Sequence, residues 1–133
     1  MEINLTIGMS YSIEKIVDEK DSAASLGSGL VPVFSTPSMI LLMEEASQMA
    51  VQNFLDDGLS TVGTLVNIQH LAATPVGFKV CACAKLIEIT GRRLVFEVEA
   101  FDTNGIIGKG LHERAVIDVE RFMSKLKERN EIQ

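Results

Sequence analysis

The spacing of apolar residues changes once along this chain, near Ser60, and the change separates two kinds of element. Between positions 38 and 54 apolar residues occupy most of a helical circumference, and neither glycine nor proline interrupts them. From position 61 onward apolar and polar residues alternate, as they do in strands with one buried face. The pattern therefore predicts one buried helix followed by a series of strands.

Tight turns between the alternating segments predict how the strands are connected. Consecutive hairpins form an antiparallel sheet, and a helix that is apolar on most sides must be covered on several of them. We therefore predict an α+β fold, a single domain over 1–133, in which a curved antiparallel sheet wraps around one long central helix. The expected strands cover 5–16, 61–71, 78–89, 94–101 and 106–119, with turns at 74–77, Thr90-Gly91 and Asn104-Gly105.

Two further segments flank this predicted core. Residues 18–34 are rich in Ser, Gly, Asp and Ala without any period, which is typical of a flexible, lid-like loop. Residues 118–130 predict a short amphipathic C-terminal helix. Its apolar stripe contains Val119, Phe122, Met123 and Leu126.

Charge and composition exclude several classes of function. The net charge of −6 argues against binding to nucleic acid or to an anionic membrane, because both need clustered Lys and Arg. No apolar run approaches the roughly 18 residues of a membrane span, and we expect a cytoplasmic protein. Cys81 and Cys83 are spaced for neither a zinc site nor an unstrained disulfide, so we expect reduced thiols and no metal. The 47% hydrophobic content suggests a subunit interface.

Four segments resemble the fluoroacetyl-CoA thioesterase family of the hot-dog fold: 33–47, 63–77, 91–102 and 105–122. The most specific are HLAATPVG at 70–77 and GLHERAVI at 110–117. The resemblance implies hydrolysis of short-chain acyl-CoA thioesters to free acid and CoA by a homodimer or a higher oligomer. Coenzyme A is then part of the substrate, and no separate cofactor is expected.

The same resemblance implies three catalytic residues, each of which also has a structural interpretation. Thr36, like Ser35, could cap the central helix. Glu44 lies in an apolar helix, where a carboxylate is costly unless it is paired or functional, and it could act as nucleophile or as general base. His70 could be a core histidine with satisfied hydrogen bonds. Its interaction with the acyl group, alongside Thr36, would polarise the carbonyl or protonate the leaving thiolate.

Three substrate-binding residues are implied as well. Gly63 would let the thioester approach the backbone, although a glycine here could simply mark a bulge or close packing against the helix. Leu30 stands where the family has an aromatic lid residue that acts as a gate. Phe34 is the other lid residue that could supply the gate.

The remaining basic and imidazole groups receive weaker assignments. We expect His112 to bond to neighbouring backbone rather than to act in catalysis. Four basic residues are candidates for the CoA phosphates, although solvated surface charge is the better explanation for any one of them: Arg92, Arg93, Lys109 and Arg114.

Two other functions are compatible with this fold. A hot-dog hydratase or dehydratase would move protons on a β-hydroxyacyl chain without releasing CoA. A non-catalytic acyl-CoA-binding module would bind the ligand without turnover.

Overall fold

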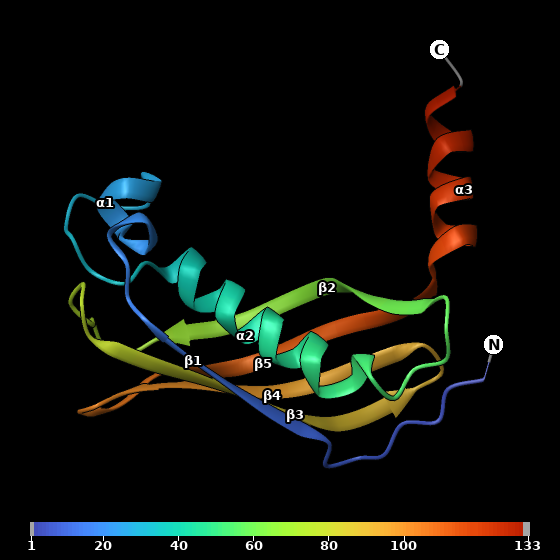
Figure 1. The fold of residues 1–133 in the computed structure, drawn as a ribbon, viewed down its shortest axis with the longest axis horizontal. Coiled ribbons are helices and arrows are strands. Elements are labelled where there is room, and N and C mark those ends of the chain that lie inside the picture. Colours follow the sequence, from blue (N-terminus) through green and yellow to red (C-terminus); the bar gives the residue numbers. More distant parts are fainter. Residues whose placement is uncertain (1, 132–133) are drawn as a thin grey trace.

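A five-stranded antiparallel sheet with one long helix on its concave face forms the body of the molecule (Figure 1). The structure is a computed structural model and describes residues 2–131. The strands lie in the order β1-β3-β4-β5-β2, so that β1 and β2 are the two edges. The elements are β1 Ser10–Ile16, η1 Glu19–Asp21, α1 Ala23–Leu26, α2 Thr36–Gln52, β2 Leu59–His70, β3 Lys79–Thr90, β4 Arg93–Asp102, β5 Gly105–Asp118 and α3 Val119–Glu131.

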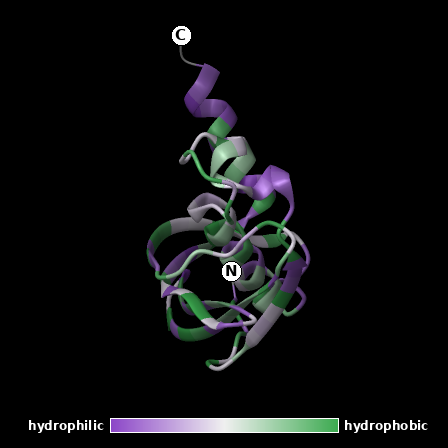
Figure 2. Cartoon of the chain, turned by 90° about the vertical axis from the view of Figure 1, so that its left-hand side faces the viewer, coloured by the Kyte–Doolittle hydropathy of each residue, from purple (hydrophilic) through white to green (hydrophobic). Residues whose placement is uncertain are grey.

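The core lies between α2 and the inner face of the sheet, which curves around the helix (Figure 2). Small residues on β3 and β4 (Ala82, Ala84 and Ala100) leave room for the larger side chains of α2. Burying each of these larger side chains stabilises the fold by about 1.5–3 kcal/mol. The predicted architecture is confirmed. The fully buried large side chains include Met39, Met43, Leu86, Leu94, Phe96 and Val98.

The start of α2 settles which residue caps the helix. Ser35 has extended backbone angles, and its Oγ accepts a hydrogen bond of 3.1 Å from the Ser38 N–H. The helix therefore begins at Thr36, just before the apolar stretch 38–54 from which it is predicted. Because Ser35 is the cap, the Thr36 hydroxyl is available for another partner.

Two strands differ from their predicted form. The first strand begins only at Ser10, because the chain turns at Gly8 with φ of 101°. On β2 the register shifts between Gly63 and Leu65, and the strand is an edge. The expected buried face is therefore incomplete: Ile68 is half-buried, whereas Val66 is exposed.

The lid segment, residues 18–34, has more structure than its composition predicted. It contains η1 and α1, and its end is fixed by a bridge between Ser22 and Phe34. The tip around Leu30 projects into solvent, with 97% of that residue exposed. The lid segment is thus anchored at both ends and open at its tip.

The remaining predicted features lie on β3 and α3. Cys81 and Cys83 are both free, and their Sγ atoms lie 3.9 Å apart on one face of β3. The C-terminal helix begins directly at the end of β5, one residue later than predicted. Within residues 2–131, the helices fall short of the length and apolar character that crossing a bilayer requires.

Candidate active site

Thr36 and His70 meet where the start of α2 approaches the end of β2. The Thr36 Oγ1 and the His70 Nδ1 lie 2.8 Å apart and share a hydrogen bond. A pocket of about 400 Å³ opens onto this pair. Its walls come from the lid segment and from the turn after β2, and they include Ala23, Ser28, Gly29, Val31, Phe34 and Leu71–Ala73.

The second ring nitrogen of His70 marks a place for a ligand. Nε2 is buried, yet it has no hydrogen-bond partner within the described residues. A buried polar atom without a partner is costly, and in a pocket this deficit is relieved when a polar ligand binds. Burial lowers the pKa of His70 from its ordinary value near 6.5, and the backbone at Ala72 opposes this only in part. His70 is therefore neutral at neutral pH and able to accept a proton.

Glu44 lies two turns into α2 and faces a different group of residues. Its Oε2 lies 3.8 Å from the Arg114 Nη1, and its side chain is 37% exposed. A Cβ added at Gly63 would lie 2.9 Å from the same carboxylate oxygen, so that only glycine leaves this space free. Glu45, its neighbour, is exposed. Glu44 is therefore the carboxylate that α2 presents beside the sheet.

Behind Glu44, a buried hydrogen-bond network holds Arg114 on β5. The Arg114 Nε donates to the Thr61 Oγ1 at 2.8 Å, and its Nη2 donates to the Thr61 carbonyl at 3.0 Å. Arg114 is 6% exposed. Burial lowers its pKa from the ordinary value, while Glu44 opposes the shift, and the guanidinium stays charged. Arg114 thus provides a fixed positive charge beside Glu44.

His112 completes this network in a single tautomer. Its Nε2 lies 3.1 Å from the Arg114 Nη1, which can only donate, and its Nδ1 lies 2.8 Å from the Leu65 carbonyl, which can only accept. The imidazole proton is therefore on Nδ1. The expected bond from His112 to neighbouring backbone is confirmed.

On the sequence alone Arg114 is a candidate for the CoA phosphates or a solvated surface charge, whereas the structure buries it. Its signal was the alternation on β5, where His112, Arg114 and Val116 are buried while the residues between them are only half-buried. A charged residue in the buried phase of a strand indicates a paired or functional group.

The three predicted catalytic residues thus form two groups in one chain. Thr36 and Glu44 are eight residues apart on one helix, which places them about 12 Å apart along its axis. Within residues 2–131 no hydrogen bond or ion pair joins Glu44 to Thr36 or to His70. A single subunit therefore presents a hydroxyl–imidazole pair and, separately, a carboxylate–guanidinium pair.

The three residues implied in substrate binding occupy different environments. Gly63 is exposed beside Glu44, and the bulge that was its alternative explanation is present at this position. Phe34 is 1% exposed and forms part of the pocket wall at Thr36. Leu30 points into solvent at the tip of the lid segment. Their contacts with a substrate remain a prediction.

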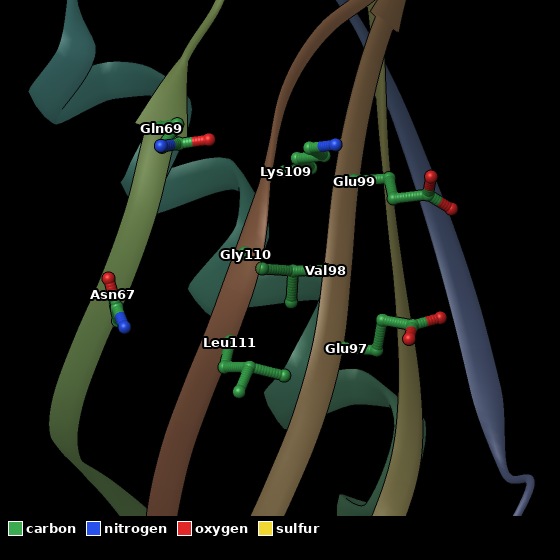
Figure 3. A pocket seen from close by; sticks show the side chains of 8 residues that line it. All are labelled: Asn67, Gln69, Glu97, Val98, Glu99, Lys109, Gly110 and Leu111. Atoms are coloured by element: carbon green, nitrogen blue, oxygen red, sulfur yellow. The ribbon is translucent and has the colours of Figure 1, made fainter.

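A larger hollow, of about 510 Å³, lies on the sheet face that points away from α2 (Figure 3). It is lined by polar and charged side chains of β2, β4 and β5, including Asn67, Gln69, Glu97 and Lys109. Neither Thr36 nor His70 contributes to it. The smaller pocket at the lid segment is therefore the one that carries reactive groups.

Two of the four candidate phosphate-binding residues are engaged within the chain. Arg93 pairs with Glu113 and Glu88, and Arg114 is buried as described. Arg92 and Lys109 are exposed. Arg93 is exposed too, but its guanidinium is held by the two carboxylates. Of the four, Arg92 and Lys109 are therefore exposed without an ion pair within residues 2–131.

A curved sheet around one helix is the hot-dog fold. The hydroxyl–imidazole pair at the helix start and the carboxylate farther along it agree with the thioesterases of that fold. The model of the fluoroacetyl-CoA-specific thioesterase family matches residues 17–120. The chain belongs to this family. Both ends of the chain, including most of α3, lie outside the matched residues.

Individual relatives agree with this assignment. A fluoroacetyl-CoA thioesterase from Streptantibioticus cattleyicolor is 42% identical over 97 residues, which cover 73% of this chain and 70% of that protein. The solved structure of the fluoroacetyl-CoA thioesterase FlK is 34% identical, with a TM-score of 0.87, over 94% of this chain and 97% of that one. A thioesterase-superfamily protein from Thermus thermophilus is 29% identical, with a TM-score of 0.86, over 98% of both chains.

Proposed function

We propose that this thioesterase hydrolyses short-chain acyl-CoA thioesters to the free acid and CoA, with Thr36 and His70 as its reactive pair. The observation that carries the proposal is the 2.8 Å contact between the Thr36 Oγ1 and the His70 Nδ1 in a pocket beneath the lid segment. A hydroxyl within hydrogen-bond reach of a neutral imidazole is the arrangement that activates an oxygen nucleophile. Family membership favours thioester hydrolysis over hydration and over binding without turnover.

The proposed reaction has two steps. His70 accepts the Thr36 proton as the Thr36 oxygen attacks the thioester carbonyl, the C–S bond breaks, and the CoA thiolate takes a proton from the imidazolium. A water molecule then gives a proton to Glu44 and attacks the acyl-threonine ester. The free acid leaves, and Thr36 recovers its proton. A short acyl group suits the small and largely apolar wall formed by Ala23, Val31 and Phe34.

This scheme requires Glu44 to approach the reactive pair, and a dimer would achieve that. β2 is an edge strand of 12 residues, and Leu65 and Val66 at its middle are exposed. Long edges with exposed apolar residues pair readily with another strand. We propose that two copies pair antiparallel along β2, about a two-fold axis near the middle of the strand.

The substrate and the reduced thiols also suit a cytoplasmic location.

An antiparallel pairing exchanges the two ends of β2. The end of β2 that carries His70 in one subunit would then lie near the part of the partner that carries Gly63, Glu44 and Arg114. In this arrangement Thr36 and His70 of one subunit face Glu44 of the other.

A relative supports CoA as part of the proposed substrate. A solved structure that is 35% identical, with a TM-score of 0.83 over 89% of this chain and 99% of that one, is a variant of FlK in complex with fluoroacetate and CoA.

Complementation between inactive variants tests the shared site directly. A Thr36→Ala chain and a Glu44→Gln chain are each expected to release little CoA thiol from acetyl-CoA. If each site takes Thr36 from one subunit and Glu44 from the other, a mixed dimer contains one site with both residues intact. Mixing the two variants under subunit exchange should therefore restore activity, to about one quarter of the wild-type rate if exchange is complete and pairing is random.

Other outcomes separate the parts of this proposal. Mixed dimers without activity would show that each site lies within one chain. Sedimentation of the native chain as a monomer at micromolar concentration would contradict the dimer itself. A thiol-release screen over acyl-CoAs of increasing length should show the highest turnover for short acyl groups. A wild-type chain that binds acyl-CoA without releasing thiol would contradict hydrolysis.

A further inference from the structure

The C-terminal helix leaves its own subunit with an apolar stripe uncovered. All residues of α3 that the structure describes are at least partly exposed, and the helix contacts its own chain mainly at the end of β5. Its stripe consists of Val119, Phe122, Met123 and Leu126, and Met123 is 53% exposed. An amphipathic helix of this kind gains its stability from packing against a partner surface.

The position of α3 in the sheet indicates where such a partner lies. α3 starts where β5 ends, beside the beginning of β2, and the Val119 N–H donates to the Gly58 carbonyl at 2.9 Å. From there the helix rises past the β2 edge, away from β1 (Figure 1). The lid segment rises on the same side at the opposite end of the sheet. Within one chain, α3 and the lid segment are therefore too far apart to touch.

In the proposed dimer these two ends come together. Antiparallel pairing about the middle of β2 brings the beginning of this strand next to the end of the partner's β2, where the lid segment lies. We infer that α3 of one subunit packs on the lid segment of the other and forms the outer wall of its acyl pocket. This inference rests on the proposed dimer.

The chemistry of the two surfaces is complementary. The lid segment exposes Leu26, Leu30 and Val31, and it leaves Leu30, its most exposed side chain, uncovered in one subunit. Two exposed carboxylates, Asp18 and Glu19, lie at the base of the lid segment beside one exposed ammonium, Lys20, so this surface is net acidic. The α3 stripe offers apolar side chains to the first group. Lys125 and Arg129 flank that stripe and offer positive charge to the carboxylates at the base of the lid segment.

This arrangement would explain how a lid without an aromatic gate can close. Leu30 is too short to cover the pocket alone, and in one subunit it lies against solvent. Phe122 and Met123 of the partner would cover it from outside and exclude water from the thioester. The partner helix, rather than the lid tip, would then limit the length of the acyl chain.

A cysteine pair tests the contact in the whole protein. In a Cys81→Ser, Cys83→Ser background, Leu30→Cys combined with Met123→Cys should form a disulfide under mild oxidation. On a non-reducing gel this disulfide should produce a covalent dimer. Leu30→Cys combined with Glu128→Cys is the matched control, because Glu128 lies on the opposite face of α3, and it should stay uncross-linked. All of these positions are at least partly exposed, so the variants should fold.

A functional readout accompanies the cross-link. Met123→Ala should move the preferred substrate toward longer acyl groups in the thiol-release screen, whereas Glu128→Ala should not. A dimer by sedimentation that forms no Leu30–Met123 cross-link, or forms it only within one chain, would overturn the inference and leave the proposed dimer intact. A monomeric chain would overturn both.

Discussion

The two reactive groups of this subunit differ in how completely their hydrogen bonds are satisfied. Around Glu44, the network of Arg114 and His112 is buried, and each guanidinium and imidazole nitrogen of these two residues has a partner. Around Thr36, the pair with His70 opens on a pocket, and the Nε2 of the imidazole lacks a partner. The first group is complete in the free protein, whereas the second is completed only by a ligand.

This difference indicates that the two groups have different roles in catalysis. A complete network holds a charge in place without reorganisation, as a site that stabilises charge in a transition state requires. The pair of Thr36 and His70 has a free nitrogen, the His70 Nε2, that can bond to the substrate. We therefore expect substitutions at His70 to affect chemistry and substitutions around Arg114 to affect the placement of Glu44.

The largest effect is expected for His70→Ala. Without the imidazole, Thr36 has no base, and losses of about 10²–10⁴-fold in kcat are typical for a general base. KM should change much less, since the interaction strengthens only as charge develops. Steady-state thiol release measures both constants. A variant that unfolds or aggregates in circular dichroism would instead support the structural interpretation of a core histidine.

Glu44→Gln should lower turnover by about 10²-fold while the fold survives, because the amide keeps the shape and loses the proton-accepting charge. Under the proposed scheme the deacylation step is the one impaired. Mass spectrometry of the quenched variant should therefore find the acyl group on Thr36. Glu45→Gln is the matched control and should be nearly silent. An acyl group found on the wild-type Glu44 would show that the carboxylate is the nucleophile.

The pH dependence should reflect the neutral form of His70. Burial lowers the pKa of His70, so the base stays unprotonated to a pH below 6.5, and activity falls about tenfold per pH unit only below that shifted value. His112 is fully buried, and burial lowers its pKa in the same direction. Because the unfolded chain binds these protons more readily, stability should also decline as the pH drops below about 6.5. Parallel measurements of kcat/KM and of thermal unfolding separate the two effects.

The sequence predicts the fold better than it predicts how the reactive groups are arranged in space. Period-two alternation and tight turns predicted the sheet, since each depends only on neighbours in the chain. Ser and Thr can both cap a helix, so residue type does not show which of Ser35 and Thr36 caps α2. Only the backbone angles distinguish them. The role of Arg114 depends on Thr61, 53 positions away, across a strand pair. The alternation on β5 can indicate that Arg114 is buried. It cannot indicate which distant residue bonds to the guanidinium.

A smaller effect is expected at Gly63, where the two interpretations of the glycine can be separated. In Gly63→Ala the added Cβ would lie 2.9 Å from the Glu44 Oε2 and 3.3 Å from the His112 Cε1. It would displace the carboxylate, which is at the end of a flexible side chain, and would press on the buried His112 ring. We expect kcat to fall by about tenfold, within the range for a misplaced catalytic group. The melting temperature should change little, because the lower cost of alanine in a strand opposes the cost of the close contact with His112. A fall in stability with unchanged kcat would mean that Gly63 serves packing alone.

The smallest effect concerns the choice between fluoroacetyl-CoA and acetyl-CoA. Leu30 has no ring face, and its side chain is exposed rather than part of the pocket wall in a single subunit. Apolar contacts separate such similar acyl groups by only about 1–3 kcal/mol, or roughly 10–200-fold. We therefore expect broad activity on short acyl-CoAs, with weak preference for the fluorinated substrate in the ratio of the two kcat/KM values. A ratio above about a thousandfold exceeds what such contacts supply. It would mean that Phe34, another lid residue or the partner's helix performs the discrimination that Leu30 cannot.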